Sequence, residues 1–337
     1  MLESPLMPET STRNLVEIRG LVKHFDVRSE GKLRQQRQVV HAINGVDLDV
    51  PTGEIVALVG ESGSGKTTLA NCVAGFVTPT SGTIGFDGRP LVETRGATVA
   101  RRASRRDMAQ NIQMVFQDPS SALNPRQTVE STLLEPLLVH RVMPKPEAVT
   151  RVTELLELSG IPASMRRRYP HELNSGQRQR LVIARALALS PRLLLADEPV
   201  SRLDVSMQSQ ILNLLLDLRE RLGLTIVFIT HDLSVVRQVA DTVVVMYLGR
   251  VMESCSADAF FSDPRHPYSQ ALVAATPRPM SDPTEIATLH GEIPSPINLP
   301  SGCPFHTRCP MVGEGCTDVV PELREVAPGH RAACIKL

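Results

Sequence analysis

The sequence predicts an α/β fold, in which a mostly parallel sheet is covered by helices on both faces. Short apolar runs at residues 55–59, 193–198 and 225–230 have the length and composition of buried strands. Between the last two, apolar residues recur at helical spacing over 205–222. Strands that alternate with helices are typical of a parallel sheet with both faces covered. A chain of 337 residues, 42% of them hydrophobic, can form one large domain with an extension, or two domains.

Charge and hydropathy exclude several classes of protein. The 36 basic and 36 acidic side chains cancel, so the bulk charge does not favour nucleic-acid binding. No apolar run approaches the roughly 20 residues that a membrane-spanning helix needs. The first residues include Glu3 and Pro5 and lack the apolar region of a secretory signal. We therefore expect a cytosolic chain without a membrane span.

A glycine-rich segment lies between the strand at 55–59 and a helix that is expected from Leu69. Residues 60–67 read Gly-Glu-Ser-Gly-Ser-Gly-Lys-Thr and match G-x-x-x-x-G-K-[ST], the P-loop. Glycines let successive backbone N–H groups converge on phosphate oxygens, and the following helix adds its positive N-terminal end. We expect Lys66 to reach the β- and γ-phosphates of a nucleotide, and the Thr67 hydroxyl to hold Mg²⁺.

An ordinary Gly/Ser turn is the alternative interpretation of this segment. Eight matching positions, with a strand before them and a helix after, disfavour it. The predicted nucleotide contacts are Gly60, Glu61, Ser62, Gly63, Ser64, Gly65, Lys66, Thr67 and Thr68.

The segments on either side of the P-loop helix indicate a second group of strands. Residues 1–14 are expected to form a flexible tail, and alternating segments at 15–18 and 45–50 indicate half-buried antiparallel strands. Residues 82–88 have the pattern of a hairpin strand with a turn. A basic segment follows, with Arg101, Arg102, Arg105 and Arg106. It is most simply a solvated helix face, and a nucleic-acid patch is the less favoured alternative.

Helical patterns dominate the middle of the chain. Residues 128–169 are expected to form an inserted helical lobe, and residues 172–189 one strong helix. The lobe is expected to break at Pro136, Pro144, Pro146 and Pro162. A helix at 233–240 and a strand pair at 242–253, turning at Gly249, follow the last buried strand. After about residue 254, prolines accumulate and indicate a separate, loop-rich extension.

Four polar residues follow or end predicted strands, at the edge where α/β sheets bind ligands. Asp197 is placed to hold Mg²⁺ through its water shell, and Glu198 to orient and deprotonate an attacking water. Gln117 follows a strand at 112–116 and can ligate Mg²⁺ or hold the water, and His231 can donate a hydrogen bond to the γ-phosphate. Each alone is more often an ordinary polar residue, but on one edge beside a P-loop they form a nucleotide sensor.

Taken together, the motifs make the chain resemble the nucleotide-binding subunit of an ABC transporter over roughly residues 15–255. In the family's order they are Phe25 as the adenine-stacking aromatic, Gly60 to Thr68 as Walker A, Gln117 as the Q-loop, Leu173 to Gln177 as the signature, Leu193 to Glu198 as Walker B with the catalytic glutamate, Ser201 to Asp204 as the D-loop, and His231 as the switch. Phe25 alone would be assigned to the core. The resemblance adds nucleotide contacts at Asn174, Ser175, Gly176, Gln177 and Asp204.

The resemblance also predicts the architecture and the cofactors. It implies a P-loop NTPase (RecA-like) core with an antiparallel β subdomain, together spanning 15–254, and an inserted helical subdomain at about 118–180. The loop-rich C-terminal extension would occupy 255–337. The cofactors would be ATP and Mg²⁺, with Thr67, Gln117 and Asp197 at the metal ion.

Further motifs resemble the peptide/nickel importer branch of the family. They are Phe116-Gln117-Asp118-Pro119, Leu123-Asn124-Pro125, Arg168-Tyr169-Pro170-His171-Glu172-Leu173, His266-Pro267-Tyr268, Ile293-Pro294-Ser295-Pro296, Gly302-Cys303-Pro304-Phe305 and Arg308-Cys309-Pro310. Pro199-Val200-Ser201, after Glu198, resembles the F-type subunit of the branch's two paired ATPases. The implied function is ATP hydrolysis that drives import of di- or oligopeptides. Import of nickel or glutathione is the alternative, and a soluble non-transport ABC ATPase is less favoured.

The resemblance implies a set of partners. They are a second ABC ATPase subunit that pairs head to tail, two transmembrane permease subunits that dock on residues of about 118–139, and an extracytoplasmic substrate-binding protein. Nucleic acid is not among them. The chain would lie at the cytoplasmic face of the inner or plasma membrane, attached through the permeases.

Two segments depart from the family pattern. The family signature reads L-S-G-G-Q, whereas residues 173–177 read Leu-Asn-Ser-Gly-Gln. Ser175 adds bulk where backbone should approach the phosphates, although Asn174 can still donate a hydrogen bond. We predict that this signature completes a weakened ATP site on a non-identical partner, while the site built on Lys66 and Glu198 keeps its full set of groups. The D-loop has Arg202 where alanine is usual.

Four of the six cysteines fall in the last 35 residues. Cys303, Cys309, Cys316 and Cys334 lack the C-x-x-C spacing of a zinc ribbon. Four thiolates suit Zn²⁺ or an iron–sulfur cluster, and the resemblance implies a 4Fe-4S cluster. Zinc and free cysteines remain alternatives. A metal would pin an extension with little core of its own. Cys72 and Cys255 look like buried structural thiols.

Overall fold

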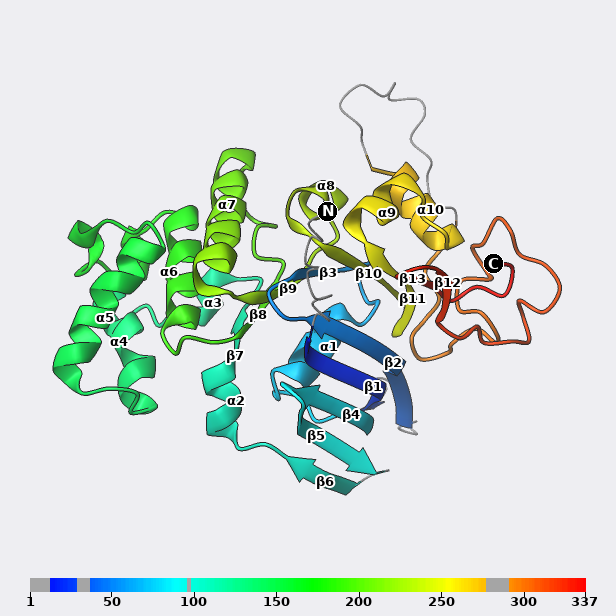
Figure 1. Cartoon of the computed structure of the whole chain (residues 1–337), viewed down its shortest axis with the longest axis horizontal. Coiled ribbons are helices and arrows are strands. Elements are labelled where there is room, and N and C mark those ends of the chain that lie inside the picture. The colour runs from blue at the N-terminus through cyan, green and yellow to red at the C-terminus, as the bar shows by residue number, and fades with distance from the viewer. Residues whose placement is uncertain (1–12, 29–36, 96–97, 277–290) are drawn as a thin grey trace, which may run out of the picture.

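The computed structural model describes residues 13–28, 37–95, 98–276 and 291–337. The predicted tail at 1–14 therefore lies outside the described residues, apart from its last two. An eight-stranded sheet forms the centre of the molecule, with the strand order β12-β13-β11-β10-β3-β9-β8-β7. Figure 1 shows the helical lobe and the C-terminal extension at opposite ends of this sheet. No helix within the described ranges combines the length and the apolar composition that crossing a bilayer requires.

Five neighbouring strands of the central sheet are parallel, as the sequence predicts. They are β10 (Thr242–Tyr247), β3 (Ile55–Val59), β9 (Thr225–Ile229), β8 (Leu193–Asp197) and β7 (Ile112–Val115). Every residue of β3, β8 and β9 is buried, which explains their unbroken apolar sequences. Because Leu195 lies opposite Val227, and Val227 opposite Val56, the carboxyl ends of these strands meet at one edge.

The remaining three strands of this sheet are antiparallel. β11 (Arg250–Ser256) returns beside β10, which confirms the strand pair that turns at Gly249. β13 (His330–Ala332) then pairs with β11, and β12 (Arg324–Ala327) pairs with β13. The end of the chain therefore extends the central sheet.

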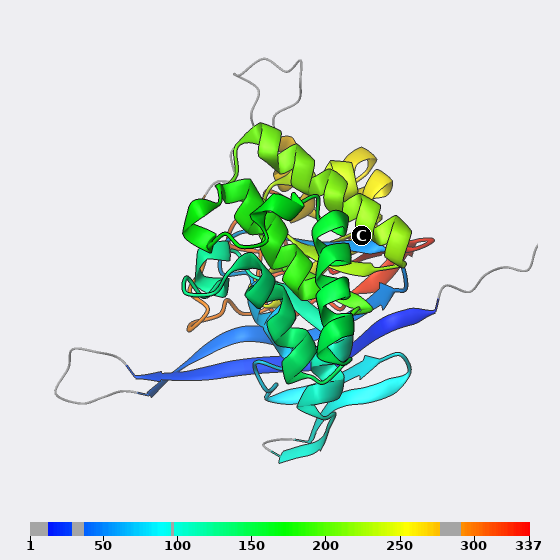
Figure 2. The ribbon, with the colours of Figure 1, turned by 90° about the vertical axis from the view of Figure 1, so that its left-hand side faces the viewer.

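A second sheet is wholly antiparallel, with the order β2-β1-β4-β5-β6. Its strands are β1 (Asn14–Arg28), β2 (Arg37–Pro51), β4 (Ser81–Phe86), β5 (Arg89–Arg95) and β6 (Thr98–Arg102). In Figure 2 the paired strands β1 and β2 reach out to one side of the molecule. The antiparallel β subdomain is thus confirmed.

The prediction of one helix face for the basic segment is wrong for its first half. Arg101 and Arg102 belong to the edge strand β6, where they lie opposite Glu93 and Val92 of β5. Backbone pairing with β5 overrides the local sequence preference there. The helix α2 (Arg105–Asn111) begins only after Ser104, whose hydroxyl accepts the Asp107 N–H.

The inserted lobe is helical, as predicted. It contains α3 (Pro119–Ala122), α4 (Val129–Val139), α5 (Lys145–Leu158), α6 (Ser175–Leu187) and the short 3₁₀ turns Ala163–Met165 and Pro170–Glu172. Figure 2 shows its long helices grouped in front of the sheets. Pro136 lies inside α4 without breaking it, contrary to the prediction, because burial of Leu133 and Leu137 of the same helix compensates for the lost backbone hydrogen bond.

The helix expected at 172–189 is shorter at both ends. α6 starts at Ser175 because Asn174 caps it: the Asn174 side chain accepts the Gln177 N–H, and the Gln177 side chain accepts the Asn174 N–H. The helix at 205–222 is confirmed as α7 (Val205–Leu222), which ends at the left-handed Gly223. α1 (Lys66–Val73) and α8 (Leu233–Val239) lie close to their predicted positions.

The C-terminal extension shares its core with the central sheet. It contains α9 (Ala257–Ser262) and α10 (Pro267–Ala274) besides β12 and β13. Three of its aromatic residues, Phe260, Tyr268 and Phe305, are fully buried in one cluster with Ala57 and Val59 of β3. The sequence analysis predicted a separate extension, whereas the structure shows a shared core. The aromatic residues are far apart in the sequence, and only the fold brings them together.

Candidate functional site

The P-loop follows β3 and requires glycine at two positions. Gly60 has a φ of +145°, and a Cβ there would collide with the backbone carbonyl oxygen of Met246. Gly65 has a φ of +105°, and a Cβ there would lie 2.5 Å from the carbonyl oxygen of Ala42. Neither conformation suits an L side chain. The loop is therefore pressed against β2 and β10 while its far side stays open.

Lys66 is folded back into the loop that precedes it. Its ammonium group donates hydrogen bonds to the carbonyl oxygens of Gly60 (2.7 Å) and Glu61 (2.9 Å) and to the Ser64 hydroxyl (3.2 Å). Burial lowers the pKa of Lys66, and the nearby carboxylates of Glu198, Asp197 and Glu61 oppose that shift. The predicted phosphate-binding cation thus lies inside the loop. Ser62 and Gly63 are exposed on this loop, and Thr68 lies in the first turn of α1.

Thr67 and Asp197 meet as predicted for a metal site. The Thr67 hydroxyl donates to Asp197 Oδ1 at 3.2 Å. Asp197 is buried at the end of β8, and this burial raises the pKa of its carboxyl group, while the hydrogen bond from Thr67 acts in the opposite sense. A hydroxyl and a carboxylate are oxygen ligands of the kind that Mg²⁺ takes, so these residues fit that ion.

Glu198 lies between Gln117 and His231. Gln117 Nε2 donates to Glu198 Oε2 at 2.7 Å, and His231 Nδ1 lies 2.9 Å from Glu198 Oε1. These residues follow β8, β7 and β9, so the carboxyl ends of three parallel strands bring them together. Glu198 has a φ of +46°, and its N–H donates to the Ile229 carbonyl. A strained backbone held by a neighbouring strand is typical of functional positions.

Other predicted contacts lie elsewhere in this single chain. Phe25 is half-buried on β1, with the ammonium group of Lys23 4.6 Å from its ring centroid. The Asp204 carboxylate caps α7 by accepting the Met207 N–H. Across the part of the chain that the structure describes, no recorded hydrogen bond or ion pair links Phe25, the residues 174–177 or Asp204 to the P-loop.

Two residues of the C-terminal extension reach the P-loop, and the sequence analysis missed both contacts. Arg308 forms two hydrogen bonds with the Glu61 carboxylate, and the Tyr268 hydroxyl accepts the Glu61 N–H. Both residues lie in short motifs that the sequence analysis noted only as features of a transporter branch. Arg308 is 247 residues from Glu61, and no local pattern in the sequence connects them.

The four C-terminal cysteines line one small cavity. Its walls are formed by Cys303, Cys309, Cys316 and Cys334 together with neighbours that include Phe305 and His306. Burial raises the pKa of the Cys303 and Cys309 thiols, and the other thiols of the group add to the shift. Among the described residues, three potential metal ligands lie within 4.8 Å of one another only at Glu253, Cys255 and His330. The four thiols thus line one cavity, but no three of their sulfur atoms form such a close group.

A groove of about 860 Å³ lies between the helical lobe and the part of the core that carries α1, α2 and β7. Phe76 and Phe116 stack in its wall with ring centroids 5.9 Å apart, and they leave 63% and 39% of their surface exposed. Val139 of α4 is 69% exposed, and Glu135 of the same helix forms an ion pair with Arg185, which also lines the groove. Exposed apolar side chains gathered around a groove indicate a protein-binding surface.

Comparisons with known proteins show the family of this chain. The ABC transporter family model matches residues 43–201, and the model of the oligopeptide/dipeptide transporter C-terminal region matches residues 252–316. A putative peptide import ATP-binding protein of Brucella ovis is 48% identical over 96% of this chain and 98% of its own length. The oligopeptide transport ATP-binding protein AppF of Bacillus subtilis is 43% identical over 97% of this chain and 99% of its own length. The di/tripeptide transport ATP-binding protein DppF of Pseudomonas aeruginosa is 44% identical over 91% and 93%, respectively.

Solved structures give the same result for the cassette. The protein cbiO1 of Clostridium perfringens, part of the ABC transporter complex cbiONQ, has a TM-score of 0.62 at 30% identity and covers 74% of this chain and 91% of its own. A dimeric ATP-binding cassette in a post-hydrolysis state with ADP and phosphate has a TM-score of 0.59 at 28% identity and covers 72% and 98%. The fold and the P-loop site thus define an ABC-type ATPase. More narrowly, the chain belongs to the ABC transporter ATP-binding proteins that carry the oligopeptide/dipeptide transporter C-terminal region.

Proposed function

We propose that this chain hydrolyses ATP to power the import of peptides through separate permease subunits. The observation that carries the proposal is the group formed by Gln117, Glu198 and His231 at the carboxyl ends of β7, β8 and β9, on the edge that carries the P-loop. The peptide substrate is inferred from the names of the relatives, whose similarity spans nearly the whole chain.

ATP binding rearranges the bonds of the P-loop lysine. Lys66 exchanges its bonds to the carbonyls of Gly60 and Glu61 for the β- and γ-phosphates, which also relieves the cost of burying its charge. Thr67, Asp197 and Gln117 would hold Mg²⁺, which neutralises phosphate charge when bound. The other seven residues of Gly60 to Thr68, and Phe25 at the adenine, complete the contacts within this chain.

Glu198 acts as the general base. Gln117 and His231 each occupy one oxygen of its carboxylate and so fix its orientation. The carboxylate takes the proton of the attacking water, and His231 donates a hydrogen bond to the γ-phosphate. The motion of Gln117 relays the state of the site to the groove beyond Phe116.

Two surfaces that this chain leaves open support the proposed partners. The signature residues Asn174, Ser175, Gly176 and Gln177, with Asp204, make only local bonds here and would contact ATP held by a second, non-identical ATPase subunit. The groove around Phe76 and Phe116 would receive a permease segment. In this proposal the chain lies at the cytoplasmic face of the membrane, with a substrate-binding protein on the other side.

The test is ATPase activity of the complex assembled with its permeases and partner ATPase. Glu198→Gln should lower turnover by about 100-fold or more while ATP still binds, because the general base is lost and the P-loop is unchanged. The matched control is Glu220→Gln, on the exposed side of α7, which should leave turnover unchanged. Near-normal turnover of the Glu198 variant would mean that the partner subunit carries the chemistry.

The cysteine cavity is proposed to hold a 4Fe-4S cluster through Cys303, Cys309, Cys316 and Cys334. The support is that four thiols line one cavity. Four thiolates suit a 4Fe-4S cluster and also zinc, so the metal content decides between them. Bound there, the cluster would cross-link the turns of the extension.

Iron, sulfide and zinc contents of protein purified without oxygen test this assignment. About four irons and four sulfides per chain are expected. Cys309→Ser should lower them, whereas Cys72→Ala, at a buried cysteine of α1, should not. One zinc per chain, or no metal in protein that is otherwise intact, would refute the cluster.

A further inference from the structure

Glu61, the second residue of the P-loop, is held by the C-terminal extension. Arg308 Nη1 and Nη2 donate to the two oxygens of the Glu61 carboxylate at 2.6 and 3.0 Å. The Arg308 side chain is only 3% exposed, so this two-point ion pair is shielded from water. The Tyr268 hydroxyl accepts the Glu61 N–H at 2.9 Å. A buried guanidinium fork on a carboxylate fixes distance and direction together.

Glu61 also contacts the P-loop lysine. Its carbonyl oxygen accepts a hydrogen bond from Lys66 Nζ at 2.9 Å and from the Ser64 N–H at 3.2 Å. The extension therefore acts on the side chain and the N–H of Glu61, while the nucleotide site acts on its carbonyl. The Glu61 N–H shares a peptide plane with the Gly60 carbonyl, which also accepts a hydrogen bond from Lys66 Nζ (2.7 Å), so a change in the bond to Tyr268 tilts that carbonyl. Arg308 acts on the Glu61 carbonyl through the side chain and Cα of Glu61.

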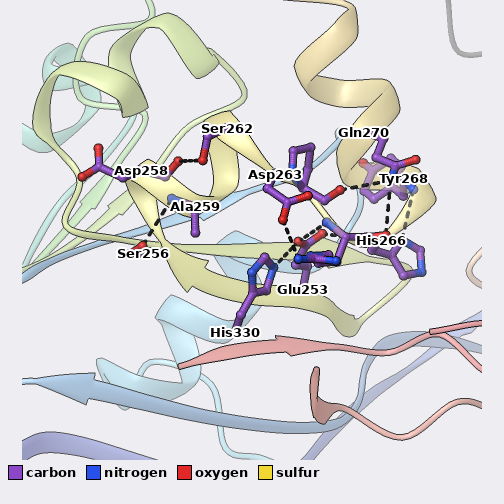
Figure 3. Close-up of polar contacts among 12 residues, drawn as sticks. Glu253, Ser256, Asp258, Ala259, Ser262, Asp263, His266, Tyr268, Gln270 and His330 are labelled. Carbon is purple, nitrogen blue, oxygen red and sulfur yellow. Dashed lines mark hydrogen bonds and ion pairs between the residues drawn. The ribbon is translucent and has the colours of Figure 1, made fainter. Parts of the chain in front are cut away.

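The extension residues are themselves firmly anchored. Glu253 of β11 is fully buried, and its carboxylate accepts the N–H groups of Arg265 (2.7 Å) and His266 (2.9 Å) and lies 2.6 Å from His330 Nε2 (Figure 3). His266 Nδ1 in turn accepts the Tyr268 N–H at 3.0 Å. These bonds occupy the carboxylate of Glu253, so the group that it forms with Cys255 and His330 is better explained as a hydrogen-bonded clasp than as a metal site. The clasp fixes the start of α10 on the sheet.

Aromatic packing connects the clasp to Arg308. The rings of Tyr247 and Tyr268 have centroids 4.8 Å apart, and Phe305 packs against both. Arg308 Nη1 lies 3.4 Å from the Tyr247 hydroxyl. Arg308 directly precedes Cys309, one wall of the cysteine cavity, and its N–H donates to the Phe305 carbonyl. A continuous chain of packed and bonded groups thus runs from the cysteine cavity to the P-loop.

We propose that Arg308 and Tyr268 are positioning residues that set the affinity of the P-loop for nucleotide by holding Glu61. The C-terminal extension then acts as a brace on the nucleotide site, and nucleotide binding is coupled to the order of the cysteine-bearing turns. Coupling of this kind is reciprocal, so nucleotide must also stabilise the turn that carries Cys309. The inference rests on the proposed ATP site and extends it to the regulation of that site.

The first readout is affinity of the full-length chain for a non-hydrolysable ATP analogue, measured by calorimetry at a temperature where all variants are folded. Arg308→Lys keeps the positive charge but cannot donate two parallel hydrogen bonds to the Glu61 carboxylate. Tyr268→Phe removes the hydroxyl that accepts the Glu61 N–H. Each should weaken binding by about tenfold. Arg308→Lys combined with Glu61→Gln should be no weaker than either single variant. The control Arg324→Lys, at an exposed arginine that bonds to the Leu337 carbonyl, should bind like wild type.

The second readout separates positioning from mere stabilisation of the fold. Hydrogen exchange at residues 303–309 should slow when the analogue binds to the wild type, and this effect should be lost in Arg308→Lys. Equal affinities of wild type, Arg308→Lys and Tyr268→Phe would overturn the inference. A wild-type hydrogen-exchange rate at residues 303–309 that does not change when the analogue binds would also overturn it. A wild-type chain that fails to bind the analogue would instead refute the proposed ATP site.

Discussion

The nucleotide site and the cysteine cavity hold their polar side chains in different ways. Asp197, Gln117 and His231 end or follow buried parallel strands, so backbone pairing fixes where they lie. Three of the cysteines and Arg308 lie in loops between α10 and β12, and Cys334 follows β13, so side-chain contacts such as the one with Glu61 place them. The first arrangement follows from the order of the strands, whereas the second exists only after the chain has folded.

The largest expected effect is at the P-loop of the nucleotide site, which backbone packing holds in place. Gly60→Ala should weaken ATP binding by roughly 100-fold or more, because its Cβ would collide with the Met246 carbonyl and force the P-loop to move. The measurement is the affinity for the ATP analogue. The matched control is Gly53→Ala, which also has a positive φ but open space around it, and which should leave the affinity unchanged. Equal affinities of both variants would show that the P-loop yields more easily than its packing indicates.

The clasp at Glu253 is expected to contribute most to the stability of the extension. Glu253→Ala should lower the free energy of unfolding by about 3 kcal/mol, because the buried His266 N–H and His330 ring, and the part-buried Arg265 N–H, all lose their hydrogen-bond acceptor. Denaturant unfolding measures this. Glu325→Gln, at an exposed carboxylate on β12, should cost less than about 1 kcal/mol. A similar loss in both variants would mean that the extension is held mainly by its aromatic cluster.

The altered signature should have a smaller effect, visible only in the assembled complex. Asn174→Ser combined with Ser175→Gly should raise ATPase turnover a few-fold, because backbone can then approach the phosphates of the partner's ATP. The affinity of this chain alone for ATP should not change, since residues 174–177 bond locally. Unchanged turnover of the complex would contradict the idea that this signature weakens the partner site.

The smallest effect is expected at the unusual D-loop arginine. Arg202 lies 3.5 Å from Asp118, and both side chains are largely exposed. Arg202→Ala should therefore change the free energy of unfolding by less than about 1 kcal/mol. Thermal unfolding at low and high salt checks this, and a larger loss at low salt would show that the pair carries more of the contact between the D-loop and the Q-loop than an exposed pair should.

Much of the fold could be predicted because its signals are local. The buried strands are unbroken apolar runs, and α7 has its apolar residues at helical spacing with a glycine at its end. Arg101 and Arg102 were misassigned, since pairing of β6 with β5 is a tertiary contact that a basic sequence does not reveal. Pro136 was expected to break a helix, but only packing decides whether a helix can tolerate a proline in its last turns.

The sequence by itself determined the nucleotide site of this protein, because each of its main groups is tied to a motif or to the end of a strand. Lys66 and Thr67 follow a fixed glycine pattern, and Glu198 follows a buried strand. Only the tertiary structure decided that Arg308 and Tyr268 hold Glu61. An ion pair between residues 247 positions apart leaves no periodic or local trace, and its partners meet only because β13 joins the sheet and the aromatic residues of the extension pack on β3 and β10.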